Sequence, residues 1–321
     1  MAVLINGKRS QRLQAAPKPV TWSVGSAQPR RTVIGNVGIA WYDSSVETAN
    51  HSEPLILIHG FCSMSYTWHE VFDQLAARRR VIAVDLKGFG ASDKPPDGNY
   101  LIDTQAAIVT GLMDALKLSR AALAGNSLGG AVALQIARNS PQRVSELVLA
   151  NPAVSPADQF PLLARLILLS GRRSGERLPA RIIGHLVRIP GLIESRIRHA
   201  HYRAATVTPE RVAAYSAMLS EPECQRAIAA TLRTFDLRQI AGNLSSVHHR
   251  TLIIQGAYDR IIRPESGAAL SRAMPRAELM MLPCGHAPQE EMPAEFARIV
   301  NEFLESVSAE RSVHENSLAV R

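Results

Sequence analysis

The sequence predicts an α/β protein with a mostly parallel sheet buried between helices, and two observations lead to this prediction. Short apolar runs without polar alternation recur along the chain, and helical patterns separate them. Such runs are typical of strands covered on both faces, and their alternation with helices is typical of right-handed crossovers. The six runs occupy residues 55–58, 81–84, 121–124, 147–150, 252–254 and 279–282.

A hairpin and five helices complete the predicted core. The segment Gly35-Asn36-Val37-Gly38 separates residues 32–34 from residues 39–42 and favours a turn between two strands. Helical patterns cover residues 68–77, 104–116, 128–138, 264–273 and 294–307.

The alternation of strands and helices is interrupted once. Residues 152–246 contain no convincing buried strand, only amphipathic helical pieces separated by prolines. We therefore predict a helical cap at 152–246, inserted into a core that residues 32–151 and 247–307 form together. Residues 1–31 are predicted to be a basic, flexible arm, and residues 308–321 a frayed polar tail.

Positive charge is concentrated in two segments of this 321-residue chain, whose formal net charge is +8. Residues 1–31 carry six cations and no acid, and residues 153–246 carry thirteen arginines against seven acids. Zinc-finger spacing and basic–aromatic ribonucleoprotein motifs are absent from the sequence, which argues against nucleic-acid binding. Weak contact of the arginine-rich cap and the basic arm with an anionic membrane surface stays open.

The apolar runs, the N-terminus and the cysteines favour a cytoplasmic protein. A location at the surface of a membrane is the alternative. No apolar run reaches the roughly 18 residues that cross a bilayer, and the N-terminus has the reverse order of a secretory signal. The three cysteines, Cys62, Cys224 and Cys284, are widely spaced. They form neither a disulfide framework nor a metal-ligand pattern.

Three polar residues each follow a predicted strand. Ser127 lies in Gly125-Asn126-Ser127-Leu128-Gly129, a G-x-S-x-G motif between an apolar run and a helical pattern. Asp259 and His286 come just after the last two apolar runs. Because the carboxyl ends of parallel strands meet at one edge of a sheet, we expect the three side chains to converge. A histidine that an aspartate orients can take the proton of a serine, so the sequence predicts a catalytic triad.

A tetrahedral intermediate also needs two N–H donors for its oxyanion. We assign these donors to the backbone of Leu128, directly after the nucleophile, and of Phe61 in His59-Gly60-Phe61. His59 itself is interpreted as a structural residue that braces this loop. The glycine-rich loop at residues 85–93 is interpreted as a scaffold turn, since it lacks the phosphate-binding pattern.

Taken together, these motifs resemble the α/β-hydrolase superfamily over about residues 32–306. The resemblance implies an eight-stranded, mostly parallel sheet, a cap inserted after the sixth strand and no cofactor. The order of the motifs in this chain is similar to that of the branch that includes epoxide hydrolases, haloalkane dehalogenases, carbon–carbon bond hydrolases, haloperoxidase-like esterases and small esterases. The motifs that carry the resemblance are His59-Gly60-Phe61, the loop at 85–92, Gly125–Gly130, Gly256–Asp259 and Gly285-His286.

Departures from these relatives narrow the expected activity. Epoxide hydrolases and dehalogenases use an aspartate nucleophile, so Ser127 argues against both activities. Carbon–carbon bond hydrolases usually have a glycine-richer oxyanion loop and a tryptophan after the histidine, where this chain has Phe61-Cys62 and Ala287. Asn151 stands where some members keep their acid, and its amide leaves Asp259 without an evident rival.

We therefore expect a carboxylic ester hydrolase (an esterase, lipase-like enzyme or lactonase) that works through an acyl-enzyme on a small hydrophobic ester-like substrate. One alternative is a carbon–carbon bond hydrolase of the meta-cleavage-product type. Another is a receptor with the hydrolase fold that binds a hydrophobic small molecule with little turnover. Apolar residues of the cap either seal it onto the core or line a tunnel for the substrate; they are Leu162–Leu169, Leu186, Ile189, Leu192 and Ile193.

Overall fold

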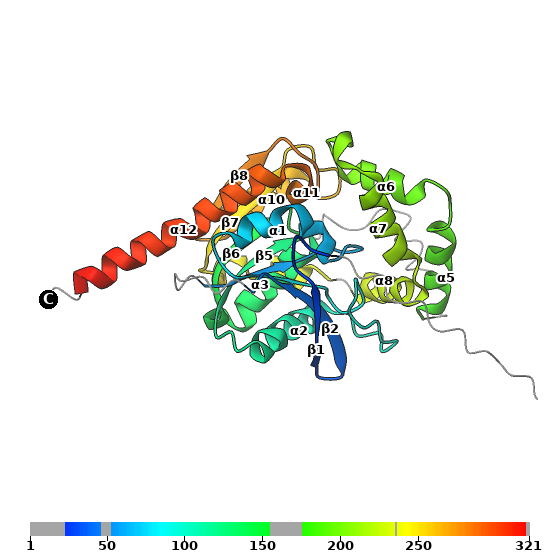
Figure 1. Cartoon of the computed structure of the whole chain (residues 1–321), viewed down its shortest axis with the longest axis horizontal. Coiled ribbons are helices and arrows are strands. Elements are labelled where there is room, and N and C mark those ends of the chain that lie inside the picture. The colour runs from blue at the N-terminus through cyan, green and yellow to red at the C-terminus, as the bar shows by residue number, and fades with distance from the viewer. Residues whose placement is uncertain (1–22, 46–52, 155–174, 235, 319–321) are drawn as a thin grey trace, which may run out of the picture.

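A twisted eight-stranded sheet forms the centre of the molecule in the computed structural model, which describes residues 23–45, 53–154, 175–234 and 236–318 (Figure 1). The strand order is β1-β2-β4-β3-β5-β6-β7-β8. Strands β1 and β2 run antiparallel to their neighbours, and the other pairs are parallel. The predicted fold class is thereby confirmed. The strands are β1 (Pro29–Ile34), β2 (Val37–Asp43), β3 (Leu55–Ile58), β4 (Val81–Val84), β5 (Ala121–Asn126), β6 (Val144–Ala150), β7 (Arg250–Gly256) and β8 (Ala277–Leu282).

Five of the six apolar runs form buried strands because both faces of the sheet are covered by helices; the run at 279–282 differs from the prediction, since it lies in the edge strand β8, where Met280 and Met281 are exposed. In β3, Ile56 and Ile58 belong to one core cluster, and Leu55 and Leu57 belong to the other. All four side chains are fully buried. A strand whose alternating side chains are buried on both faces has no position for a polar residue, which explains the uninterrupted apolar pattern.

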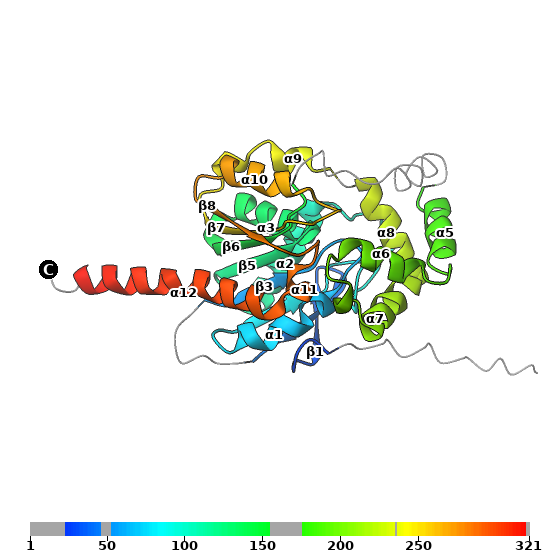
Figure 2. The ribbon, with the colours of Figure 1, turned by 90° about the horizontal axis from the view of Figure 1, so that it is seen from above.

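Two groups of helices cover the sheet (Figure 2). The face that carries Leu55 and Leu57 packs on α1 and α12, and the face that carries Ile56 and Ile58 packs on α2, α3 and α10. Each of these helices was predicted, with ends within two residues of the prediction except that α12 continues eleven residues beyond its predicted end. Their bounds are α1 (His69–Ala76), α2 (Ile102–Ala115), α3 (Leu128–Asn139), α10 (Pro264–Ala273) and α12 (Pro293–Leu318), and the short α11 (Pro288–Glu291) precedes α12.

A helical cap stands between β6 and β7 in the chain and lies to one side of the sheet (Figure 1). Helix α5 packs on α8, and α7 contacts both α6 and α8. The predicted apolar segment Leu162–Leu169 lies outside the described residues. The described helices between β6 and β7 are α5 (Arg177–Leu186), α6 (Leu192–Ala200), α7 (Pro209–Ser220), α8 (Pro222–Thr234) and α9 (Arg238–Ala241).

The predicted arm at residues 1–31 and the predicted tail at residues 308–321 each lie only partly within the described residues. Residues 1–22 lie outside the described part, but the Ser26 backbone N–H and hydroxyl both donate to Asp73 of α1, at 3.1 and 2.8 Å. At the other end, α12 continues to Leu318 and extends away from the body (Figure 1). Residues 308–318 contain no glycine or proline, so nothing in their sequence ends the helix.

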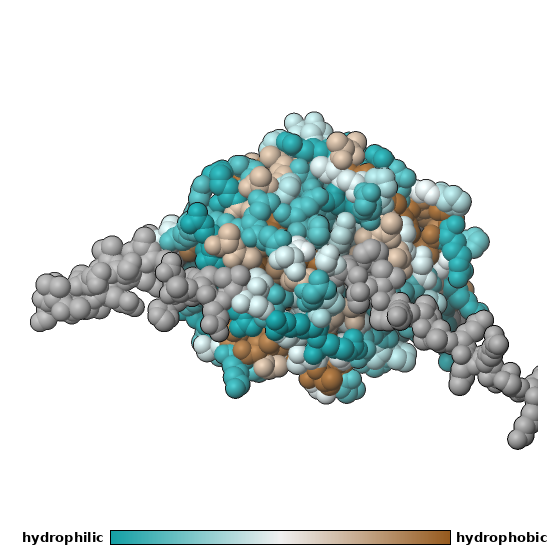
Figure 3. Space-filling view, viewed as in Figure 1, coloured by the Kyte–Doolittle hydropathy of each residue, from teal (hydrophilic) through white to brown (hydrophobic). Residues whose placement is uncertain are grey.

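The outer surface of the cap bears on the predicted contact with anionic membranes. Figure 3 shows mostly hydrophilic surface on this side of the molecule, with hydrophobic surface over the cap beside α5. Leu178 and Ile189 are each 43% exposed there. Among the described residues, no helix combines the length and apolar character that a membrane span requires. The membrane contact stays a prediction.

Candidate active site

The turn between β5 and α3 holds Ser127 in a strained backbone conformation. Its φ of 53° and ψ of −116° lie outside the regions that residues with a side chain ordinarily occupy. Close packing enforces this turn: a Cβ on Gly125 would lie 2.3 Å from the Gly129 carbonyl oxygen, and a Cβ on Gly129 would lie 2.1 Å from that of Ile58. The flanking glycines are therefore needed at this turn, as the G-x-S-x-G motif predicts.

Asp259 and His286 meet after the last two strands. The His286 Nδ1 atom lies 2.8 Å from Asp259 Oδ2. The other carboxylate oxygen of Asp259, Oδ1, accepts the backbone N–H groups of Ile261 at 2.7 Å and Ile262 at 3.0 Å. The Asp259 side chain is fully buried, whereas that of His286 is 14% exposed. Because a carboxylate only accepts, it holds a proton on Nδ1 and leaves Nε2 as the basic atom of the ring.

Two asparagines join the loops that carry these residues. Asn126 Nδ2 donates to the carbonyl oxygens of Ala150 and His286, at 3.0 and 3.1 Å. Asn151 is completely buried; its Nδ2 donates to the Gly285 carbonyl at 3.0 Å, and its Oδ1 accepts the Gly256 N–H at 2.7 Å. Asn151 thus connects the ends of β6, β7 and β8. The sequence showed only that this residue stands where some family members have an acid.

The two predicted oxyanion donors lie beside Ser127. Leu128 is the first residue of α3, where backbone N–H groups have no partner within the helix. The loop carrying Phe61 is equally close, because a Cβ on Gly60 would lie 3.2 Å from Ser127 Cβ. His59 braces this loop as predicted: its Nε2 accepts the Leu86 N–H at 2.9 Å, and its Nδ1 lies 2.8 Å from the Gly60 carbonyl.

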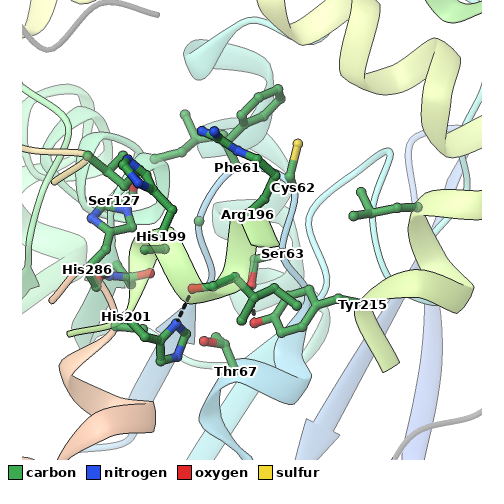
Figure 4. A pocket seen from close by; sticks show the side chains of 18 of the residues that line it. Phe61, Cys62, Ser63, Thr67, Ser127, Arg196, His199, His201, Tyr215 and His286 are labelled. Atoms are coloured by element: carbon green, nitrogen blue, oxygen red, sulfur yellow. Dashed lines mark hydrogen bonds between the residues drawn. The ribbon is translucent and has the colours of Figure 1, made fainter. Parts of the chain in front are cut away.

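A cavity of about 660 Å³ between the core and the cap brings these residues together. Ser127, Leu128, Phe61 and His286 all line it, and Figure 4 shows Ser127 next to His286. Asp259 lies behind His286 and does not line the cavity. Apolar side chains from the cap form much of the opposite wall; they include Ile183, Val187, Leu192, Ile193, Ile197, Leu219, Ile228 and Leu232.

Exposed cations stand at the border of this cavity. Arg196 of the cap and Arg260 and Arg263, which follow β7, contribute to its lining and are exposed to solvent. Within the described part of the chain, none of these three guanidinium groups lies within ion-pair distance of a carboxylate. Their charge is therefore available to a bound anion.

Glu290 is the centre of a buried polar network in the same cavity. Its Oε1 accepts the hydroxyls of Thr67 at 2.6 Å and Tyr215 at 2.7 Å. Its Oε2 lies 3.0 Å from His201 Nε2 and 3.1 Å from Arg211 Nε. Thr67 belongs to the core, whereas the other three partners come from the cap. The network therefore attaches the cap to the core through one carboxylate (Figure 4).

The network keeps Glu290 and His201 charged. Burial alone would raise the pKa of Glu290, but the hydrogen bonds from His201 and Thr67 and the positive charges of Arg211 and His201 outweigh burial and lower it to about 2. Burial alone would lower the pKa of His201, but its hydrogen bond to Glu290 and the Glu290 charge raise it. The His201 Nδ1 atom also lies 2.9 Å from the Ile197 carbonyl. With only acceptors at both ring nitrogens, His201 is an imidazolium ion.

Replacing Glu290 with glutamine is expected to lower the free energy of unfolding by about 3–5 kcal/mol, because Arg211 and His201 would lose their buried counter-charge. The effect should be largest between about pH 4.3 and 6.5. The Glu290 contribution disappears as the pH falls through its folded pKa of about 2, and the His201 contribution disappears as the pH rises through its raised pKa. Urea unfolding at several pH values measures both effects.

The control for this variant is Glu302→Gln. Glu302 pairs with Arg298 one turn away on the exposed side of α12, at 2.7 Å, and should contribute less than about 0.5 kcal/mol. A Glu290→Gln loss no larger than that of the control would contradict the proposed attachment of the cap.

Neighbouring Glu291 connects the cap to the loop of His286. Its Oε1 accepts the Gly285 N–H at 2.8 Å, and its Oε2 accepts the N–H groups of Tyr202 and Arg203, at 2.8 and 2.9 Å. The His286 N–H donates to the carbonyl of Ala200, the last residue of α6, at 2.8 Å. Sequence analysis missed Glu290 and Glu291, although two adjacent acids just after a predicted catalytic histidine were a usable signal.

Comparisons with known proteins agree with the fold described above. The family model described as alpha/beta hydrolase fold matches residues 53–181. A 2-hydroxymuconate semialdehyde hydrolase from a Pseudomonas species is 32% identical, over 80% of this chain and 88% of its own length. A 2-hydroxy-6-oxo-2,4-heptadienoate hydrolase from Pseudomonas putida is 31% identical, over 84% of this chain and 96% of its own length.

Among solved structures, a thermophilic esterase from Thermogutta terrifontis, determined with bound malate, is similar to this chain. It is 25% identical, with a TM-score of 0.70, and the match covers 88% of this chain and 99% of the esterase. In the described residues, no cluster of three or more histidine, cysteine, aspartate or glutamate side chains has an arrangement suited to a metal ion.

Proposed function

Because the chain belongs to the α/β-hydrolase superfamily, we propose that Ser127, His286 and Asp259 are its catalytic triad and that it hydrolyses a carbon–carbon bond beside a ketone. The observation that carries this proposal is the 2.8 Å contact between His286 Nδ1 and Asp259, with Ser127 and His286 lining one cavity. The substrate class is an acidic product of aromatic ring fission.

In this mechanism the Ser127 hydroxyl attacks the ketone carbon while His286 Nε2 takes its proton. The oxyanion that forms accepts the backbone N–H groups of Phe61 and Leu128. The tetrahedral intermediate then breaks the carbon–carbon bond. For this step the substrate is in its keto form, in which the proton of the 2-hydroxyl group has moved to the carbon next to the ketone. The electron pair of the broken bond is delocalised through the remaining double bond onto the 2-carbonyl oxygen, and this oxygen takes the proton from His286 to give the enol of the departing product. Water, deprotonated by His286, finally hydrolyses the acyl-enzyme to a carboxylic acid and free Ser127.

Two observations support an acidic ring-fission product over the simple ester that the sequence favoured. The two curated relatives are named as hydrolases of 2-hydroxymuconate semialdehyde and of a heptadienoate. Arg196, Arg260 and Arg263 place positive charge at the border of the cavity, and a guanidinium group suits a carboxylate. Alanine in place of tryptophan after the histidine still separates this chain from the usual pattern of carbon–carbon bond hydrolases.

The test compares 2-hydroxy-6-oxo-2,4-heptadienoate with p-nitrophenyl butyrate as substrates of the wild-type chain. We expect kcat/KM to be at least about 100-fold higher for the dienoate, because only the dienoate offers a carboxylate to the cationic border. Loss of the dienoate absorbance measures the rate, and release of acetate identifies the broken bond. Fast ester hydrolysis with no consumption of the dienoate would contradict the proposal.

Ester hydrolysis is the second candidate function, and the apolar cap wall favours it. The same three residues cleave an ester by the same steps, with an alcohol as the leaving group. The similar esterase of Thermogutta terrifontis supports this candidate. The receptor hypothesis predicts binding without turnover, so covalent labelling of Ser127 by a fluorophosphonate followed by a rate measurement distinguishes it from both hydrolases.

A further inference from the structure

Two hydroxyl groups face the cavity away from the predicted nucleophile. Ser63, which precedes the short helix at Ser65–Trp68, and Tyr215 of α7 both line the cavity. Their oxygens lie 3.2 Å apart. Figure 4 shows both side chains apart from Ser127 and His286, beside the Glu290 network. No step of the proposed mechanism uses either hydroxyl.

The position of the protons in this group follows from Glu290. The carboxylate is ionised and can only accept hydrogen bonds. Thr67, Tyr215 and His201 donate hydrogen bonds to it, and Arg211 forms an ion pair with it. The Tyr215 proton is therefore committed to Glu290, at 2.7 Å. Burial and the adjacent Glu290 charge raise the pKa of Tyr215 well above its ordinary value, so the phenol stays protonated.

Tyr215 consequently presents only lone pairs to the cavity. Its single proton is occupied, and so Ser63 must be the donor in the 3.2 Å contact between the two hydroxyls. The Ser63 hydroxyl can also turn its proton toward a ligand, because no other partner holds it within the described residues. The pair thus offers a ligand one fixed acceptor and one donor that can rotate.

We propose that Ser63 and Tyr215 form a subsite that selects substrates with a hydroxyl group distant from the cleaved bond. A hydroxyl is complementary to the pair, because it donates to Tyr215 and accepts from Ser63. A methyl ether or a ketone accepts from Ser63 but leaves the Tyr215 oxygen without a donor. The inference rests on the proposed function in one respect only, namely that the cavity is the substrate site.

The selectivity arises because, in the complex with a methyl ether or a ketone, no ligand group donates a hydrogen bond to the Tyr215 oxygen. Tyr215 is 8% exposed and Ser63 is 9% exposed, so a bound ligand excludes the water that would otherwise satisfy them. A buried polar group left without a partner weakens binding more than a good hydrogen bond strengthens it. We expect a hydroxyl ligand to bind about tenfold more tightly than its methyl ether.

The experiment measures binding to the full chain carrying Ser127→Ala, so that no ligand is consumed. One ligand pair is ethyl 6-hydroxyhexanoate and ethyl 6-methoxyhexanoate, with the variable group on the acyl side. The second pair is 4-hydroxybutyl acetate and 4-methoxybutyl acetate, with that group on the alcohol side. Calorimetry should give the tenfold preference for the hydroxyl compound in at least one pair. In Tyr215→Phe and Ser63→Ala, each combined with Ser127→Ala, the preference should fall below about threefold.

The matched control is Tyr100→Phe, since Tyr100 is also buried but donates to the Pro95 carbonyl, at 2.8 Å, and does not line the cavity. It should keep the preference. Ser63→Ala removes a single oxygen and provides the result if Tyr215→Phe fails to fold. Equal binding within both pairs, failure of both pairs to bind, or a preference that both variants retain would overturn the inference. Hydrolysis of the dienoate without hydroxyl preference refutes the subsite alone, whereas hydroxyl preference without any hydrolysis refutes the proposed function alone.

Discussion

Replacing Ser127 with alanine is expected to lower kcat for the ring-fission product about 10⁶-fold. The hydroxyl supplies the bond-forming oxygen, and the other serine among the described lining residues, Ser63, lies beside Tyr215 and apart from His286 (Figure 4). Alanine occupies the same strained turn at φ 53° as serine does, so the loss should come from chemistry and not from unfolding. Single-turnover measurements with excess enzyme provide the sensitivity that this range requires.

The matched control for this variant is Ser145→Ala. Ser145 is a buried serine of β6 that lies outside the cavity, so its replacement should leave kcat within about twofold of wild type. Binding of the dienoate to Ser127→Ala should persist, because the apolar wall and the border arginines are unchanged. A Ser127→Ala protein that retains more than about one hundredth of wild-type activity would contradict the assigned nucleophile.

Replacing Asp259 with asparagine should reduce kcat by about 10⁴-fold through the tautomer of His286. The N–H groups of Ile261 and Ile262 both donate to Oδ1. They would hold the amide oxygen of asparagine at that position and turn its NH₂ group toward His286. The ring must then accept at Nδ1 and carry its proton on Nε2, where it can no longer take the proton of Ser127.

Asp114→Asn is the control for the charge change, because Asp114 is exposed and its carboxylate forms an ion pair with Arg143, at 2.7 Å. It should leave kcat unchanged within about twofold. The Asp259→Asn effect should appear in kcat with little change in the binding of the dienoate to the corresponding Ser127→Ala double variant. Loss of that binding would instead indicate a collapsed cavity and contradict the tautomer argument.

The sheet and the positions of three catalytic candidates could be predicted because strand ends are readable in the sequence. Ser127 and Asp259 each follow a run of buried apolar residues, His286 follows the apolar edge strand β8, and parallel strands bring such ends to one edge. The glycines at 125 and 129 are equally readable, since close packing against backbone carbonyls permits no side chain there. The roles of Asn126 and Asn151 depended on contacts between three loops, which no local pattern encodes.

The Glu290 network could not be predicted, because its members come from separate elements whose packing has no strand register to fix it. Arg211 and Tyr215 share a face of α7, His201 follows α6, and Thr67 lies in the core. Each alone is an ordinary polar residue in a helical pattern. The type of bond that is cleaved could not be predicted from local sequence patterns either. The same triad can act on esters and on ketones, and the choice between these substrates depends on the cavity that the cap completes.

The contacts of Glu291 and Ala200 bind the loop that carries Gly285 and His286 to both the core and the cap. Gly285 and His286 are held by hydrogen bonds to the core on one side and to the end of α6 on the other. If the cap rotated outward about this edge as a rigid body, it would move His286 away from Asp259 and break the 2.8 Å contact between them. Exchange of substrate and product that keeps these contacts would leave the Asp259–His286 pair intact.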